Sequence, residues 1–287
     1  MKVAFGTVIY EEGFDYVLDY ISSLNNQTYN DFDILLLNDN LSNEQESYIY
    51  DNLIIKPKIF KNMNGLKPHQ LRVELIRKAK VENYDLLILG DFDDVFSEDR
   101  ISSMVAEFDN EFCFFYNELY YMGSTKKFFS KIPDITQDIG CILESNYIGL
   151  SNSALNLNYI TKHIVNELNG CTNSVFDWYM YSLLLHLGLK GKKITGGKTF
   201  YRIHELNIAG KSNDSYEDIT KELEIKIRHY LALKNKNIIY SEKLKDYIKL
   251  KRDIENKKLN IMDYIDHGND YWWGKLNLNK MECFKND

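Results

Sequence analysis

The sequence predicts an α/β fold in which helices cover a mixed, mostly parallel sheet. Over residues 1–98, short apolar runs alternate with segments whose apolar residues recur at helical spacing. Some runs, such as residues 34–37, are apolar at every position, which is typical of parallel strands that are covered on both faces. Strands that alternate with helices in this way form an open α/β domain.

The first three elements form a βαβ unit. Residues 2–10, KVAFGTVIY, are predicted to be a continuous apolar strand. Residues 14–27 then repeat their apolar side chains at helical spacing, and residues 32–39, FDILLLND, form a second strand. A crossover helix between two strands places both strands parallel in one sheet.

The same alternation continues to residue 91. Residues 57–62, PKIFKN, predict a short strand, and residues 69–82 predict a helix. Residues 84–91, YDLLILGD, predict another buried strand. The second half is less regular. Its expected elements are a strand at 111–122, a loop to about residue 140, helices at 153–168 and 176–188, a strand and loop at 198–210, and two charged helices from about residue 215.

The composition narrows the function classes. A net charge of −7 and a pI near 5.5 argue against a nucleic-acid partner, because phosphate contacts require a basic face. The four cysteines form no CxxC pair, which argues against a zinc knuckle or a disulfide framework. The N-terminus lacks a signal-peptide cleavage pattern, and no apolar run approaches the ~20 residues of a membrane span. We therefore expect a reduced, cytoplasmic protein.

Acidic residues follow two of the predicted strands. Asp39 ends one strand, and Asp91, Asp93 and Asp94 follow another in the stretch LLILGDFDDVF. In parallel sheets, ligands gather at the carboxyl ends of the strands, so these side chains are expected on one rim. Closely spaced carboxylates can hold a hard divalent cation with coordination sites left open for phosphate oxygens and water. The alternative is a solvated acidic loop, which short Asp clusters commonly form.

Five segments, in order, resemble the GT-A fold glycosyltransferases of family 2. The opening strand, helix and strand resemble the start of these enzymes, and LLILGDFDD resembles their Asp-x-Asp-Asp signature. LRVELIRKA is similar to a helix that carries an Ala-Arg-Asn stretch, and FDWYMYSLLLHLG is similar to an acceptor-side helix that begins with a catalytic Asp. YRIHELNIAG resembles an element of the rhamnosyltransferase-like branch. The resemblance covers about residues 3–210.

The resemblance implies a nucleotide-diphosphate sugar donor, a UDP- or TDP-sugar being favoured, together with Mn²⁺ or Mg²⁺ and transfer with inversion. The family's roles fall on eight residues: donor contacts on Thr7, Tyr10, Asp39, Arg72 and Asp91, metal ligation on Asp93 and His204, and the general base on Asp177. Residue chemistry agrees with the last role, since an inverting transfer needs a carboxylate on a segment separate from the metal site.

Plainer interpretations stay open for several of these residues. An Asp at a helix start is often a cap, a lone His is often hydrogen-bonded in place, and an Arg such as Arg72 can pack its stem on a helix. The chain also departs from the family at Asn38, Val73 and Phe176, which leaves the nucleotide undetermined. Two rival functions are a haloacid-dehalogenase-like phosphatase with Asp91 as nucleophile and a catalytically silent module that binds sugar nucleotides or glycans.

The expected organisation is a GT-A domain over residues 1–212 and a C-terminal helical extension over 213–287. The donor half of the domain covers about 1–98, and the acceptor half about 99–212. The acceptor is expected to be a glycan or a lipid-linked sugar in surface polysaccharide synthesis. The basic, apolar helices and the pair Trp272 and Trp273 fit a peripheral contact at the inner face of a membrane, packing on their own domain, or a homodimer contact.

Overall fold

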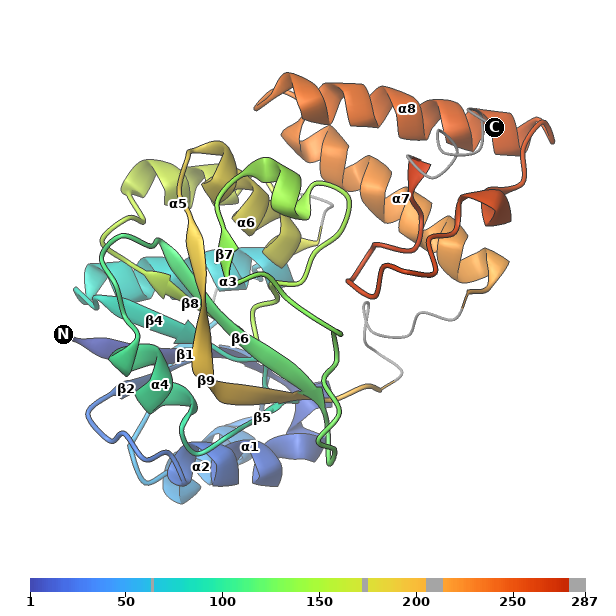
Figure 1. Cartoon of the computed structure of the whole chain (residues 1–287). Coiled ribbons are helices and arrows are strands. Elements are labelled where there is room, and N and C mark those ends of the chain that lie inside the picture. The colour runs from blue at the N-terminus through green and yellow to red at the C-terminus, as the bar shows by residue number, and fades with distance from the viewer. Residues whose placement is uncertain (63–64, 172–174, 205–213, 279–287) are drawn as a thin grey trace. The chain divides into compact units, whose positions relative to one another are not determined.

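The structure is a computed structural model, and it describes residues 1–62, 65–171, 175–204 and 214–278 (Figure 1). The strands are β1 (Val3–Tyr10), β2 (Asp33–Asp39), β3 (Lys58–Lys61), β4 (Leu86–Leu89), β5 (Val95–Phe96), β6 (Phe114–Tyr121), β7 (Ile135–Thr136), β8 (Ser153–Asn156) and β9 (Gly191–Tyr201). The α-helices are α1 (Val17–Asn25), α2 (Asn43–Asn52), α3 (Pro68–Val81), α4 (Arg100–Ala106), α5 (Lys162–Leu168), α6 (Phe176–His186), α7 (Tyr216–Leu233) and α8 (Ile238–Glu255). Short 3-10 helices are η1 (Glu11–Tyr16), η2 (Ile139–Ile142) and η3 (Ile261–Tyr264).

One sheet contains all the strands, in the order β3-β2-β1-β4-β8-β6-β9-β5, with β7 paired to β9. The strands β3, β2, β1 and β4 are parallel neighbours, as the βαβ pattern predicts. The strand β8 is antiparallel to both β4 and β6, while β6 and β9 are parallel. The predicted α/β fold is confirmed, with its parallel part concentrated in the first half of the chain.

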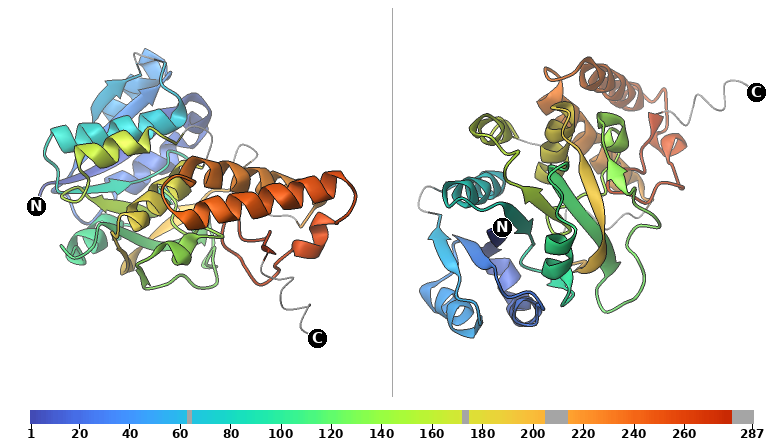
Figure 2. Two further views of the ribbon diagram at one scale, coloured as in Figure 1. Left: turned by 90° about the horizontal axis from the view of Figure 1, so that it is seen from above. Right: turned by 60° about the vertical axis from the view of Figure 1, so that its left-hand side comes forward.

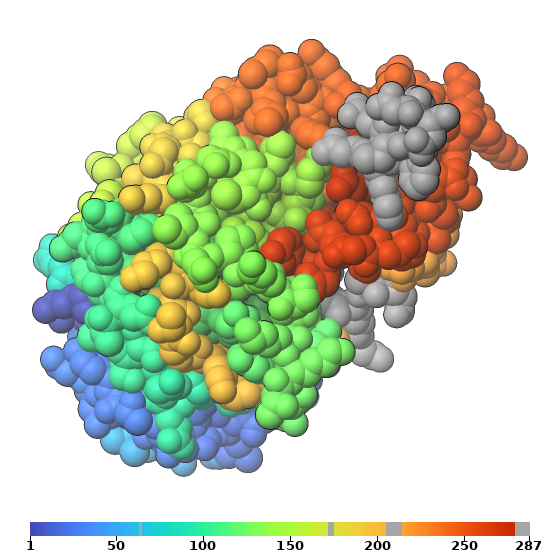
Figure 3. Space-filling view, viewed as in Figure 1, coloured from blue at the N-terminus to red at the C-terminus, as the bar shows by residue number. Residues whose placement is uncertain are grey.

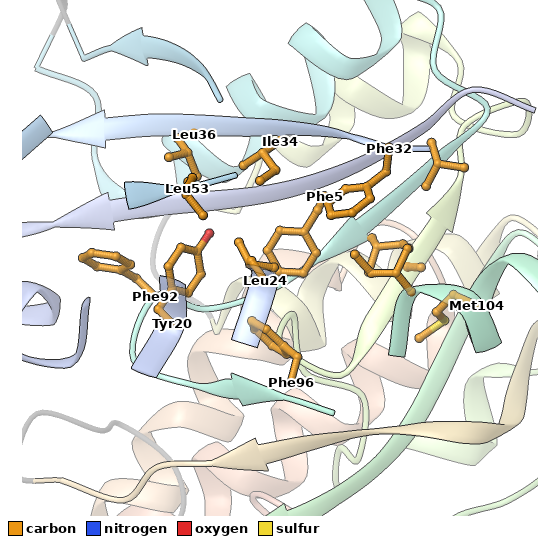
Figure 4. Packing of buried hydrophobic residues seen from close by; sticks show 14 of the residues in the cluster. Phe5, Tyr20, Leu24, Phe32, Ile34, Leu36, Leu53, Phe92, Phe96 and Met104 are labelled. Atoms are coloured by element: carbon orange, nitrogen blue, oxygen red, sulfur yellow. The ribbon is translucent and has the colours of Figure 1, made fainter. Parts of the chain in front are cut away.

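The central strands are buried on both faces. On one face, Phe5 of β1, Tyr20 and Leu24 of α1, and Met104 of α4 belong to one apolar cluster (Figure 4). On the other face α3 packs against β1 and β2, and α5 lies beside α3 (Figure 2). This two-sided cover explains the uninterrupted apolar runs, because each side chain of the strand meets a helix layer.

Two elements correct the sequence predictions. The helix expected over residues 153–168 is wrong in its first part, because Ser153–Asn156 forms β8 and the helix α5 begins only at Lys162. All four residues of β8 are buried, and the strand pairs with β4 on one side and β6 on the other. Pairing within the sheet therefore decides the structure of this segment, although its apolar residues are also compatible with helical spacing. The helix α2 was not predicted, although Ser42 and Gln45 form a capping box at its start, which is a sequence signal for a helix N-terminus.

The chain divides into two compact units. The first unit contains residues 1–137, 148–169 and 189–202, which include the whole sheet. Its strand β9, gold in Figure 3, lies at the surface beside α4. The second unit contains residues 138–147, 170–188 and 203–287. The predicted boundary at residue 212 therefore stays a prediction, since two earlier segments group with the C-terminal helices.

The second unit is organised around buried aromatic and charged side chains. Trp178 of α6 stacks on His229 of α7, with ring centroids 3.8 Å apart. Tyr230 of α7 stacks on Tyr247 of α8 at 5.4 Å. Trp272, 9% exposed, is held by its own unit through a backbone hydrogen bond from Asn146, 2.8 Å long. Within the described ranges, no helix is long and apolar enough to cross a membrane.

Candidate active site

The carboxyl ends of β1, β2 and β4 bring most of the predicted donor residues to one rim. Tyr10, the last residue of β1, is paired in register with Asp39, the last residue of β2. The strand β4 pairs with β1 on the other side and ends at Leu89, two residues before Asp91. Because these three strands are parallel neighbours, their ends meet at one edge of the sheet.

The turn after β4 is fixed by the core beneath it. Phe92 lies between the two carboxylates of the Asp-x-Asp pair and is fully buried, and its ring packs edge-on against Tyr20, 5.0 Å away (Figure 4). Gly90 has no room for a side chain, since a Cβ there would lie 2.4 Å from the ring of Phe5. The alternation of an anchored ring with flanking carboxylates explains the residue order Asp-Phe-Asp.

Two residues that the sequence analysis missed support the turn from below. Arg100, fully buried at the start of α4, donates hydrogen bonds from Nη2 to the backbone carbonyls of Leu89 at 2.6 Å and Ser151 at 2.8 Å. The Ser151 hydroxyl accepts a hydrogen bond from the backbone N–H of Asp91, 3.3 Å long. The local sequence of α4, RISSMVA, gives no signal for this role beyond a single arginine at its start.

The carboxylates of the turn are crowded. Burial raises the pKa of Asp91 to about 6, and Asp93 adds to the rise while Arg72 and Arg100 oppose it. The Asp91 side chain keeps 33% exposure, so solvent moderates this effect. Burial also raises the pKa of Asp94 well above its ordinary value, with Asp93 and Asp91 contributing repulsion. The free turn therefore disfavours full ionisation.

Arg72 and Tyr10 both interact electrostatically with the carboxylates of the turn. Nη2 of Arg72, on α3, lies 3.8 Å from Oδ1 of Asp91. Burial raises the pKa of the Tyr10 phenol, and the charges of Asp93 and Asp91 raise it further, so the hydroxyl stays protonated. The structure thus brings Tyr10, Arg72, Asp91 and Asp93 together and offers a phenol, a guanidinium and two carboxylates to a ligand.

Asp39 is held at the rim by amide groups. Its Oδ1 accepts hydrogen bonds from Nδ2 of Asn62 at 2.9 Å and of Asn40 at 3.1 Å. The neighbouring Asn38, where the family commonly has an Asp, donates from Nδ2 to the Glu46 carboxylate at 2.6 Å. An aspartate there would face Glu46 with like charge, which gives the departure a physical reason.

Thr7 lies apart from these residues. Its side chain is 1% exposed, and its hydroxyl accepts a hydrogen bond from Tyr20, 2.9 Å long. This hydroxyl serves the contact between β1 and α1, so the structure does not bring the Thr7 side chain to the rim. A donor contact by Thr7 stays a prediction.

Asp177 and His204 belong to the second unit. Asp177 is the second residue of α6, is partly exposed, and accepts a hydrogen bond from the backbone N–H of Trp178 at 2.7 Å. This contact fits a first-turn carboxylate and leaves the base assignment a prediction. His204 is partly exposed. Its assignment as a metal ligand also stays a prediction.

The donor set of the turn fits a hard cation that shares its coordination with a ligand. No group of three or more His, Cys, Asp or Glu side chains with metal-binding geometry occurs among the described residues. Asp93 and Asp91 nevertheless offer oxygen ligands beside a third carboxylate, and a cation would relieve their mutual repulsion. Hard divalent ions such as Mg²⁺ are commonly bound through one or two carboxylates plus substrate phosphates.

The first unit also contains an open hollow of about 580 Å³. Its walls come from α1, from Asn26 and Thr28, from residues 95–99, and from Phe200, and none of the predicted donor residues lines it. The rim, which combines a titratable cluster with strand ends, is the better candidate for chemistry.

The mixed, mostly parallel sheet with its flanking helices is the GT-A fold of glycosyltransferases. Residues 5–153, more than half of the chain, match the family described as glycosyl transferase family 2. The chain belongs to glycosyltransferase family 2. The matched region contains Tyr10, Arg72 and the carboxylate turn but neither Asp177 nor His204. This membership leaves the phosphatase hypothesis without support.

Solved structures with the same fold include S. aureus TarS 1–349 in complex with UDP-GlcNAc, at 11% identity and a TM-score of 0.58, covering 89% of this chain and 73% of that one. The mannosyltransferase PcManGT from Pyrobaculum calidifontis, in complex with GDP-Man and Mn²⁺, is 8% identical with a TM-score of 0.54, and the coverage is 91% and 77%. GalNAc-T7 with UDP, GalNAc and Mn²⁺ is 14% identical with a TM-score of 0.55, and the coverage is 81% and 48%. No curated protein sequence matches the chain.

Proposed function

We propose that the protein is a metal-dependent, inverting glycosyltransferase that moves a sugar from a nucleotide diphosphate to a glycan or a lipid-linked acceptor. One observation carries the proposal: Tyr10, Arg72, Asp91 and Asp93 gather at the strand ends, where burial and repulsion raise the pKa of Asp91. Asp39 lies beside Tyr10 in register. Such a rim suits a ligand that brings its own phosphate groups and a cation.

Each residue of the donor half is proposed to contact a different part of the nucleotide sugar or the metal ion. The Asp39 carboxylate, at the outer end of β2, is suited to accept hydrogen bonds from the base. The Arg72 guanidinium is suited to the ribose or the diphosphate, because its planar fork matches phosphate oxygens. Asp93, with Asp91, would hold Mn²⁺ or Mg²⁺, and the bound ion would neutralise charge on the departing diphosphate. His204 is proposed as a further metal or diphosphate contact.

Asp177 is the proposed general base. It would take the proton from the acceptor hydroxyl as that oxygen attacks the anomeric carbon, from the side opposite the diphosphate. The residue is partly exposed at the start of α6, where the helix dipole favours a negative charge. An accessible carboxylate is what this step requires.

The proposal also specifies the donor nucleotide, the branch of the family, and the acceptor with its place in the cell. A UDP- or TDP-sugar is the proposed donor, on the resemblance of the sequence to the family; the solved structures with this fold include complexes with both UDP-GlcNAc and GDP-Man. The rhamnosyltransferase-like branch rests on the motif at 201–210, most of which lies outside the described residues. The acceptor is proposed to belong to surface polysaccharide synthesis at the inner face of a membrane, with contact or dimer formation through the C-terminal helices.

Calorimetric titration with UDP, TDP, GDP and CDP, each with and without Mn²⁺, tests the donor site. We expect one nucleotide to bind only with the metal, and Asp93→Ala to abolish that binding. Glu74→Ala, a charge removal on a partly exposed face of α3, is the matched control and should bind as the wild type does. Absence of binding for all four nucleotides would refute the donor site.

Asp177→Asn separates an enzyme from a silent binding module. Slow hydrolysis of the nucleotide sugar, with water as acceptor, should fall by about 10²- to 10⁴-fold, which is the usual contribution of general-base catalysis. Metal-dependent nucleotide binding should stay unchanged. A wild-type protein that binds the nucleotide and neither hydrolyses nor transfers the sugar would instead be the silent module.

A further inference from the structure

We infer that Arg202 is a positioning residue for the carboxylate turn, one that holds Asp93 and Asp94 from outside while its charge is balanced elsewhere. The inference rests on the proposed function for its consequence, which is the affinity of the turn for a divalent cation and nucleotide. Its structural part concerns only the first unit, to which Arg202, the turn and α1 all belong.

Arg202 follows directly after β9 and forms two hydrogen bonds to the turn. Its backbone N–H donates to Oδ1 of Asp94, and its Nε donates to the backbone carbonyl of Asp93, both at 2.8 Å. The first contact orients a carboxylate that is 1% exposed, and the second fixes the peptide that carries the proposed metal ligand. Together they tie the end of β9 to a turn more than a hundred residues earlier in the chain.

The other end of the guanidinium is anchored away from the turn. Nη2 of Arg202 lies 2.5 Å from Oδ2 of Asp19 on α1, and the guanidinium lies over the ring of Tyr16, 4.4 Å from its centroid. The Arg202 side chain is 18% exposed, whereas that of Asp19 is 59% exposed. The planar fork is thus fixed between two acceptors, an arrangement that a lysine ammonium cannot reproduce.

The two ends of the guanidinium have different partners. Nη2 forms an ion pair with the Asp19 carboxylate, while Nε donates to the backbone carbonyl of Asp93. The charge of Arg202 is thus paired with α1, and its hydrogen bonds order the peptide that carries the proposed metal ligand.

The test compares Arg202→Ala and Arg202→Lys with the wild type. Arg77→Ala is the matched control, because Arg77 forms a solvent-exposed pair with Glu74 on α3. Backbone hydrogen exchange of residues 88–96 is measured first, without ligand. We expect at least tenfold faster exchange in Arg202→Ala and no change in Arg77→Ala. Exchange that is unchanged in Arg202→Ala would overturn the inference.

Calorimetry then measures the affinity for Mn²⁺ with the nucleotide that the wild type binds. We expect affinity at least tenfold weaker in Arg202→Ala, and Arg202→Lys to restore less than half of that loss in logarithmic terms. Full restoration by lysine would overturn the inference, because charge alone would then suffice. If the wild type binds no nucleotide, the proposed function fails, and hydrogen exchange alone decides on Arg202.

Discussion

The carboxylate turn of the first unit and the Glu144 cluster of the second unit treat buried acids in opposite ways. In the turn, burial raises the pKa of Asp91 to about 6 and that of Asp94 well above its ordinary value. Around Glu144, burial alone would also raise the pKa, but Lys226, Lys243 and the Tyr247 hydroxyl outweigh it and lower the pKa to about 2. One site gathers acids, and the other surrounds an acid with cations.

The difference supports the proposal that the turn, and not the Glu144 cluster, binds a ligand. Glu144 is charge-balanced from within its own unit: Lys243 forms a close ion pair with Oε1, and the Tyr247 hydroxyl donates to Oε2 at 2.6 Å. Lys226, fully buried, donates to the Glu144 backbone carbonyl. In the turn, Asp94 accepts a hydrogen bond from the Arg202 backbone N–H but has Asp91 and Asp93 as like-charged neighbours, so an added cation would stabilise it. A buried pair supports structure, whereas crowded like charges indicate a binding site.

The largest loss of stability is expected for Glu144→Gln, which removes the acid from the balanced cluster. The glutamine keeps the shape but leaves two ammonium groups without their carboxylate, and breaking a buried pair in this way costs about 3–5 kcal/mol. All three tryptophans of the chain, Trp178, Trp272 and Trp273, lie in the second unit, so their fluorescence during urea unfolding reports on this cluster. The control Glu74→Gln, on a partly exposed helix face, should change stability by less than about 0.5 kcal/mol.

The stability of the second unit should depend on pH, because the pKa of Glu144 is lowered in the folded protein. The pKa of Glu144 lies below its value in the unfolded chain, so its contribution is complete above pH 4.5 and is lost as the pH falls toward 2. The expected loss is about 3 kcal/mol, and Glu144→Gln should not show it. Burial also lowers the pKa of His229, so stability should begin to fall below pH 6.5. A tryptophan-detected midpoint that stays flat between pH 6 and 2 would contradict this account.

The smallest effect should have the opposite sign. The pKa of Asp91 is raised in the folded protein, so its contribution is complete below pH 3.8 and is lost as the pH rises through about 6. Asp91→Asn should therefore stabilise the metal-free protein at pH 7.5 by about 1 kcal/mol, a value reduced because the side chain is one-third exposed. Hydrogen exchange of β4 in the presence of a chelator measures this change, and a loss of stability would show that the turn is already neutralised.

The sequence predicted the parts of the fold and site that depend on local pattern. Strands β1, β2 and β4 follow from uninterrupted apolar runs, and Asp39 and Asp91 reach the same edge because parallel strands end together. The strand β8 was misread as helix because only its place between β4 and β6 specifies it. The hydropathy pattern of a segment does not indicate which strands, far away in the sequence, it will pair with.

The supporting side chains could not be predicted for a similar reason. Arg100 reaches Ser151 across 51 residues, and Arg202 reaches Asp93 across 109 residues. Glu144 meets Tyr247 across 103 residues. Each is an ordinary charged residue in its local sequence, and its role arises only when the tertiary structure removes it from water. The residues named by motif were those whose spacing is itself the signal.

We propose that the carboxylate turn binds a cation and that the Glu144 cluster does not. Free Mn²⁺, counted by electron paramagnetic resonance in the presence of the nucleotide that binds, tests this claim for the wild type, Asp93→Asn and Glu144→Gln. The account predicts one bound ion per chain in the wild type, the same number per folded chain in Glu144→Gln, and none in Asp93→Asn. Binding that survives Asp93→Asn, or that disappears in folded Glu144→Gln, would contradict it.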